Sequence, residues 1–302
     1  MSDDHTQTEL EPIDTTSAQL QAFAQEPSDT ELFRELKRKL KSSSDAGHLA
    51  KLYELRAPAE KDPLAMSRMW VDAAMLRTEL GAHDDAEADF RAALELQPGY
   101  EKASTALFQL LVKEQRFAEA ADVADDECRV LEESLVQTDS ATLKRRLAAR
   151  YRAVARLWQE ELGRLDKALQ CWQRSFQLEP SKVEALEQSR NIYRSLGDEG
   201  MVVKLYEAEL EIIGNTNRAR RADIELALGG LKRKRMDTQG AAQHLESALE
   251  LNPSSVDAQE SLAEVLATLD TEAEHKRASE LFVKLGKRRL ETEDQEGAIS
   301  YL

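Results

Sequence analysis

A skeleton of four residues recurs three times along the chain, and it constrains the fold more than any other feature. Each copy has an alanine, a large apolar residue four positions later, a small residue three after that, and a proline five further on. Residues three and four apart share one face of a helix, and proline ends a helix because it has no amide hydrogen to donate. The skeleton therefore predicts a packed helix that is repeated along the chain. The copies are Ala86, Phe90, Ala93 and Pro98; Ala168, Trp172, Ser175 and Pro180; and Ala241, Leu245, Ala248 and Pro253.

The residues upstream of each skeleton extend the pattern. Gly81 and Gly163 each lie five residues before a skeletal alanine, and Trp70 lies sixteen residues before Ala86. With these residues the chain resembles the tetratricopeptide repeat family, whose unit is a helix pair of about 34 residues. The resemblance implies that small side chains let the paired helices approach while large ones fill the space beside them. It implies an all-α fold, a right-handed superhelical solenoid of antiparallel helix hairpins.

The repeat period divides the chain into helix pairs. We predict one array of about six or seven hairpins over residues 29–302, with the last one incomplete. The segments that match well are 67–100, 149–182 and 222–255, and those that match weakly are 29–62, 101–134 and 183–216.

The first 28 residues differ in composition from the rest. They contain six acidic residues and no lysine or arginine, and Thr, Ser, Gln and Pro fill most other positions. A segment so poor in apolar residues cannot offset the entropy lost on folding. We therefore predict that residues 1–28 form a disordered acidic tail.

The C-terminal end also departs from a complete repeat. Phe282, Leu285 and Gly286 fit the first helix of a new repeat, and Ala298 and Leu302 fit its second helix. The sequence would then stop inside a helix, whereas solenoid ends usually carry a polar cap. We expect the N-terminal piece of a longer protein. The alternative is a natural terminus that docks on a partner or on a second copy, which would allow self-association.

Charge and hydropathy exclude several classes of partner. The chain has 41 Lys and Arg against 57 Asp and Glu, a net charge of −16. Binding to nucleic acid draws on dominant positive charge, so we expect none. Nothing approaches the roughly twenty apolar residues of a spanning helix, and the first residues lack an apolar signal region. We expect a cytoplasmic protein that does not insert into membranes.

The sequence offers little that could carry catalysis. Its five histidines are scattered and its two cysteines, Cys128 and Cys171, stand alone, so no metal-ligand spacing is present. Phosphate-binding and nucleophile motifs are missing from it as well. We expect no cofactor, no metal and no enzymatic activity, and we predict a protein-interaction scaffold or adaptor. The alternative is a docking or regulatory region of a longer enzyme whose catalytic domain lies beyond residue 302.

Basic clusters lie on helices that we assign as the first of a pair. They include Lys37 to Lys39, Lys144 to Arg146, Lys232 to Arg235 and Lys287 to Arg289. Such clusters can serve as favourable charge at helix C-termini with neighbouring acids. They can also form positive stripes along one wall of the solenoid, which would fit a partner protein or peptide with an acidic segment.

The resemblance also implies where a partner binds. In tetratricopeptide arrays the first helix of each repeat lines the concave groove. When the family's groove positions are carried over to this sequence, the groove residues are Arg68, Val71, Met75, Lys102, Gln109, Arg150, Leu157, Asn191, Arg194, Leu226 and Arg233.

The three tryptophans are a separate case. We expect Trp70 and Trp172 in the core and Trp158 partly exposed.

Overall fold

Every regular element that the structure describes is helical. The computed structural model describes residues 15–291, which form two compact units. Unit 1 ends at Cys171 and unit 2 begins at Trp172, so the division falls inside one helix, α9 (Leu165–Leu178). Absence of strands in this range and the recurrent hairpins confirm the predicted all-α class.

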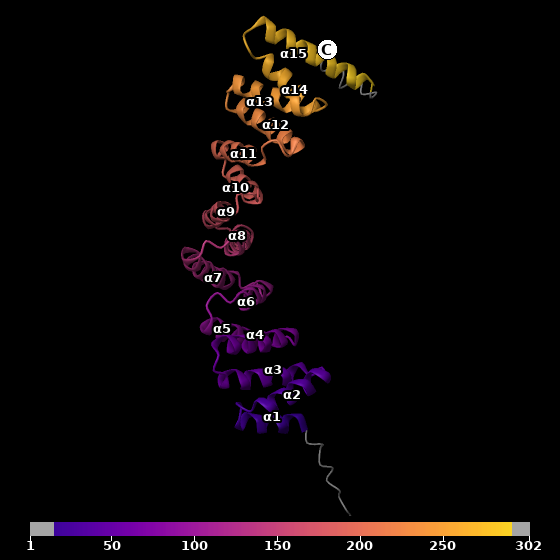
Figure 1. Ribbon diagram of the computed structural model, residues 1–302. Coiled ribbons are helices and arrows are strands. Elements are labelled where there is room, and N and C mark those ends of the chain that lie inside the picture. Colours follow the sequence, from indigo (N-terminus) through magenta and orange to yellow (C-terminus); the bar gives the residue numbers. More distant parts are fainter. Residues whose placement is uncertain (1–14, 292–302) are drawn as a thin grey trace, which may run out of the picture. The chain divides into compact units, whose positions relative to one another are not determined.

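Unit 1 is a succession of helix hairpins in sequence order (Figure 1). Helix α2 packs on α3, α4 on α5, and α6 on α7, while α8 returns along α7. A 3-10 turn follows α3 at Ala57–Ala59, and a π-helical turn follows α8 at Leu157–Glu161. The helices are α1 (Thr15–Gln25), α2 (Thr30–Ser42), α3 (Ala46–Arg56), α4 (Pro63–Glu79), α5 (His83–Leu96), α6 (Glu101–Lys113), α7 (Phe117–Gln137) and α8 (Ala141–Arg156).

Unit 2 repeats this arrangement. Helix α10 packs on α11, α12 on α13, and α14 on α15. The lengths of these pairs match the repeat segments predicted at 183–216 and 222–255. The helices are α10 (Glu184–Ser195), α11 (Glu199–Ile213), α12 (Arg218–Lys234), α13 (Thr238–Leu251), α14 (Val256–Leu266) and α15 (Glu272–Glu291).

The turn inside a hairpin usually contains one residue with a left-handed backbone. Glycine supplies it at Gly81, Gly163 and Gly197, where φ lies between 62° and 77°. Gln115 and Met236 adopt φ of 62° at the equivalent points, as does Ser44 with φ of 56°. Such a residue ends the first helix by turning the chain back. Residues other than glycine adopt this left-handed conformation at a cost in free energy.

The repeat register predicted from the sequence is confirmed by the packing. Ala86, Ala168 and Ala241, the skeletal alanines, are fully buried. Gly229 lies so close to the facing helix that a Cβ there would be 2.5 Å from Cγ of Leu245. Small residues therefore do stand where the two helices of a hairpin touch.

The N-terminal segment differs from the predicted tail. Residues 15–25 form helix α1, which packs on α2 and α3. Its Phe23 is fully buried, with its ring centroid 6.1 Å from that of Phe33, and Leu20 is buried in the same cluster. The prediction of disorder is therefore wrong from residue 15 onward, because two apolar residues at helical spacing suffice to dock a short helix. Residues 1–14 lie outside the described range.

Helix α15 closes the last described hairpin. Phe282 packs on the cluster of α13 and α14, and Leu285 is buried. The structure therefore assigns these residues to the second helix of a pair with α14, and not to the first helix of a new repeat. The predicted final helix with Ala298 and Leu302, and the open end expected to self-associate, lie outside the described residues.

Candidate protein-binding surfaces

The first helices of unit 1 lie side by side. Helix α4 contacts α6, and Arg150 of α8 donates a hydrogen bond of 2.9 Å to the hydroxyl of Thr105 on α6. The structure brings four predicted groove residues to the surface of α4 and α6. The four exposed residues are Arg68, Met75, Lys102 and Gln109.

Three predicted groove residues of unit 1 are buried, and for them the prediction is wrong. Val71 packs in the core with 3 % of its surface exposed, and Leu157 begins the π-helical turn with 5 % exposed. The guanidinium of Arg150 pairs with the Glu127 carboxylate at 2.5 Å and lies 5.1 Å from the ring centroid of Phe108. Because Glu127 is itself buried, it needs a cation, and Arg150 turns inward to supply it.

The predicted residues of unit 2 divide in the same way. Asn191 and Arg194 are exposed on α10 and share a hydrogen bond of 3.2 Å. Arg233 is exposed on α12 but forms an ion pair with Glu264 of α14. Leu226 is half-buried against the core of the α12 to α15 hairpins. Hence only part of the predicted basic stripe in this unit is free of neighbouring acids.

Charge is segregated between the two kinds of helix in unit 1. The first helices α2, α4, α6 and α8 contain 15 Lys and Arg but 5 Asp and Glu. The second helices α3, α5 and α7 contain 4 Lys and Arg but 13 Asp and Glu. Neither Arg68 nor Lys102 forms an ion pair with another described residue. The excess lies mainly on α8 and α2, with net charges of +6 and +3, whereas α6 has +1 and α4 has none. The first helices as a set are therefore positive although the whole chain is strongly negative.

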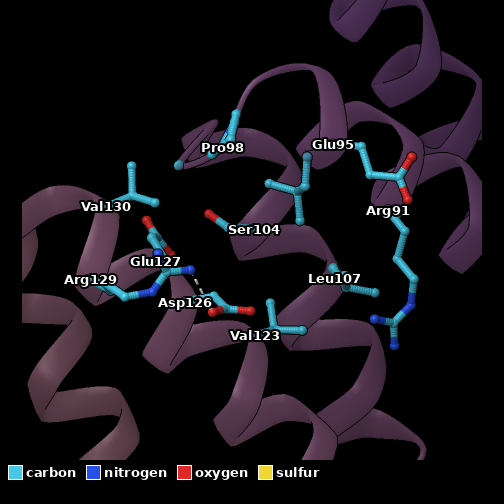
Figure 2. Close-up of a pocket in the computed structure, with 12 residues that line it drawn as sticks. Arg91, Glu95, Pro98, Ser104, Leu107, Val123, Asp126, Glu127, Arg129 and Val130 are labelled. Atoms are coloured by element: carbon cyan, nitrogen blue, oxygen red, sulfur yellow. Dashed lines mark hydrogen bonds and ion pairs between the residues drawn. The ribbon is translucent and has the colours of Figure 1, made fainter.

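A groove opens between the second helices α5 and α7, above helix α6 (Figure 2). Its volume is about 320 Å³, and the α5–α6 loop at Pro98 and Gly99 borders it. Gly99 has φ of 76°, and a Cβ there would lie 2.8 Å from Cγ1 of Val130 on α7. The apolar lining is Leu94, Pro98, Leu107, Val123 and Val130, and the charged lining is Arg91, Glu95, Asp126, Glu127 and Arg129.

Unit 2 has a groove at the same place in its repeats. It lies between α13 and α15, and Leu249, Glu250 and Leu262 stand where Leu94, Glu95 and Leu107 stand in unit 1. Its α15 wall carries Arg277 and Lys284. The groove thus follows from the spacing of successive second helices, and its charge is set by the sequence.

Buried carboxylates join neighbouring helices, and the sequence analysis missed them. Asp89 accepts a hydrogen bond of 2.6 Å from Arg77, which also pairs with Glu54. Burial raises the pKa of Asp89 to about 6, although Arg77 opposes the shift. Glu127, Glu209 and Glu225 are buried in the same manner beside Arg or His side chains. The sequence did contain a signal for these buried carboxylates: they are acidic residues at helix positions that otherwise hold small or apolar residues.

The two cysteine thiols are protonated core groups. Burial raises the pKa of Cys171 to about 12 and that of Cys128 still further. In the range 15–291, no group of three His, Cys, Asp or Glu side chains is placed to hold a metal ion.

The tryptophans depart from expectation. Trp172 is fully buried as predicted, but Trp70 is only half-buried. Trp158, expected to be partly exposed, has 9 % of its surface exposed, and Nζ of Lys167 lies 3.9 Å from its ring centroid. Trp158 lies in the π-helical turn, where the regular period used to place it on the surface does not hold.

None of the helices in the described part of the chain combines the length and the apolar content needed to cross a bilayer.

A tetratricopeptide repeat family model matches residues 67–100, which span α4 and α5. Three solved structures resemble the fold. The structure of Naa15/Naa10 bound to HypK-THB is 15 % identical, with 91 % of this chain and 40 % of that chain covered and a TM-score of 0.50. The MamA protein is 14 % identical, with 62 % of this chain and 92 % of that chain covered and a TM-score of 0.40. YrrB, described as a TPR protein with an unusual peptide-binding site, is 18 % identical. The match covers 69 % of this chain and 96 % of that chain, with a TM-score of 0.39.

No curated protein sequence matches the chain. The repeat at 67–100, the hairpins of both units and the residues buried at their contacts agree with one another. Residues 67–100 thus match the tetratricopeptide repeat family, and the other hairpins of both units have the same all-α, helix-pair fold.

Proposed function

We propose that this protein is a non-catalytic interaction scaffold whose first helices in unit 1 bind an acidic segment of a partner protein. The observation that carries the proposal is the charge segregation between first and second helices. A positive face on a net-negative chain repels most anionic surfaces, yet it attracts an acidic segment that fits its spacing. Nucleic acid remains an unfavourable partner because the rest of the molecule is negative.

Arg68 and Lys102 are the residues best placed for this contact. Each is exposed on a first helix, α4 or α6, and each lacks an ion pair with the described residues around it. Met75 and Gln109 are exposed on the same two helices and add apolar and hydrogen-bonding surface. Cytoplasmic location is part of the proposal, in keeping with a sequence whose two cysteines make no disulfide framework.

A labelled peptide of alternating glutamate and leucine tests the proposal by fluorescence anisotropy. The double variant Arg68→Glu/Lys102→Glu should weaken its binding about tenfold, and added salt should weaken binding to the wild type. The matched control is Lys51→Glu/Arg129→Glu, which makes the same charge change on second helices of unit 1. An equal loss of affinity in both variants would contradict the proposal that the peptide binds to the first-helix face.

A further inference from the structure

We infer that the groove between α5 and α7 is a second docking site, for a basic amphipathic segment of a partner protein. This site lies on second helices, whereas the proposed function rests on first helices. The inference therefore goes beyond that function and does not depend on it.

The groove offers an apolar floor within reach of a ligand side chain. Leu107 of α6 is fully buried beneath it, while Leu94 of α5 and Val123 and Val130 of α7 are half-buried in its walls. Figure 2 shows these side chains around the groove, with Leu107 coming from α6 and both Val123 and Val130 from α7. A volume of about 320 Å³ has room for aliphatic anchors of a helix laid between the two walls.

The charge around the groove selects a basic ligand. Helices α5 and α7 together carry 12 Asp and Glu but only 2 Lys and Arg. Both cations are already engaged, because Arg91 pairs with Glu87 at 2.7 Å and Arg129 with Asp126 at 3.0 Å. Of the acids that line the groove, Asp126 is engaged by Arg129 and buried Glu127 by Arg146 and Arg150. Glu95, exposed on the rim, forms no ion pair with a described residue. An incoming lysine or arginine would therefore gain attraction from this rim and an acidic ligand would be repelled.

The equivalent groove of unit 2 supplies an internal contrast. It has the same leucines at the same repeat positions, but Arg277 and Lys284 face its opening from α15. Each groove is lined by three acids and two basic residues, so the contrast lies in the helices that form the walls. Helices α5 and α7 carry 12 Asp and Glu against 2 Lys and Arg, whereas α13 and α15 carry 6 of each. The inference is limited to that groove for this reason.

The probe is a labelled amphipathic peptide of about 14 residues, with leucines on one helical face and lysines on the other. A scrambled peptide of the same composition and a glutamate-for-lysine peptide are measured beside it. The variant Glu95→Lys/Asp126→Lys reverses the rim, and Leu94→Gln removes one apolar wall. The matched control is Glu160→Lys/Glu161→Lys, an equal charge change at exposed residues of the π-helical turn in the same unit.

We expect saturable binding of the amphipathic peptide that falls about tenfold in the rim variant and in Leu94→Gln, and not in the control. Circular dichroism melts of every variant separate lost binding from lost folding. The inference is overturned if the scrambled peptide binds equally well, if the control loses as much as the rim variant, or if no saturable binding occurs. Arg68→Glu/Lys102→Glu should leave this binding intact, so the result stands apart from the test of the first-helix face.

Discussion

Arg190 and Glu209 form a buried ion pair inside the α10/α11 hairpin, with Nη1 lying 2.5 Å from Oε2. Their side chains are 4 % and 0 % exposed, and the guanidinium also lies 4.2 Å from the ring centroid of Tyr206. Arg190 stands at a repeat position where the family favours a small residue. The hairpin therefore replaces close helix contact by a charge pair, with Arg220 donating a further bond of 2.7 Å to Glu209.

Removing one partner of this pair should be costly. Glu209→Ala leaves Arg190 buried without its counter-charge, and we expect a loss of about 3–5 kcal/mol of unfolding free energy. Urea denaturation followed by circular dichroism measures it. Glu207→Ala, at an exposed acid of the same helix, should change stability by less than about 0.5 kcal/mol. The double change Arg190→Met/Glu209→Leu should recover most of the loss, and failure to do so would mean that the pair does more than balance charge.

Two adjacent glycines of α12 give a matched test of the hairpin contact. A Cβ at Gly229 would lie 2.5 Å from Cγ of Leu245, whereas a Cβ at Gly230 would meet nothing within 4 Å. Gly229→Ala should therefore destabilise the protein by about 1–3 kcal/mol through overpacking. Gly230→Ala should stabilise it by about 0.5–1 kcal/mol, because alanine favours the helix. Thermal melts of both variants decide the matter, and equal effects would contradict the register.

The left-handed turn residues predict stabilising substitutions. Gln115 and Met236 hold φ of 62° at positions where other hairpins use glycine. Gln115→Gly and Met236→Gly should each raise the unfolding free energy by about 0.5–1 kcal/mol, because glycine adopts this conformation without strain. Gly81→Ala, the reverse change, should lower it by a similar amount. A lower melting temperature for both glycine variants would show that their side chains stabilise the turn.

The buried carboxyl of Asp89 predicts a pH dependence. Its pKa is raised from 3.8 to about 6 by burial, so between these values the folded protein holds a proton that the unfolded chain has released. The contribution of Asp89 to the free energy of unfolding is therefore fully present below pH 4 and is lost as the pH rises through 6. Relative to Asp89→Asn, the wild type should lose about 3 kcal/mol of unfolding free energy across that window. Denaturant melts at a series of pH values measure the difference, and a constant difference would place the Asp89 pKa near its ordinary value.

The helical hairpins and their register could be predicted from the amino-acid sequence alone. Three skeletons of alanine, a large apolar residue, a small residue and proline were enough, because helix packing demands small and large side chains at fixed spacing. Ala86, Ala168 and Ala241 are buried where that spacing placed them. The exposure of Arg68 and Lys102 likewise followed from their positions on first helices.

The packing between helices determines which polar side chains turn inward and where a groove opens, and the sequence pattern did not predict either. Arg150 occupies a groove position but faces Glu127, because a buried carboxylate attracts the nearest cation across a helix contact that spans 23 residues of sequence. The groove beside Leu107 depends on the distance between α5 and α7, which no single repeat encodes. Helix periodicity specifies one face of one helix, whereas burial, ion pairing and cavities arise from several helices packed together.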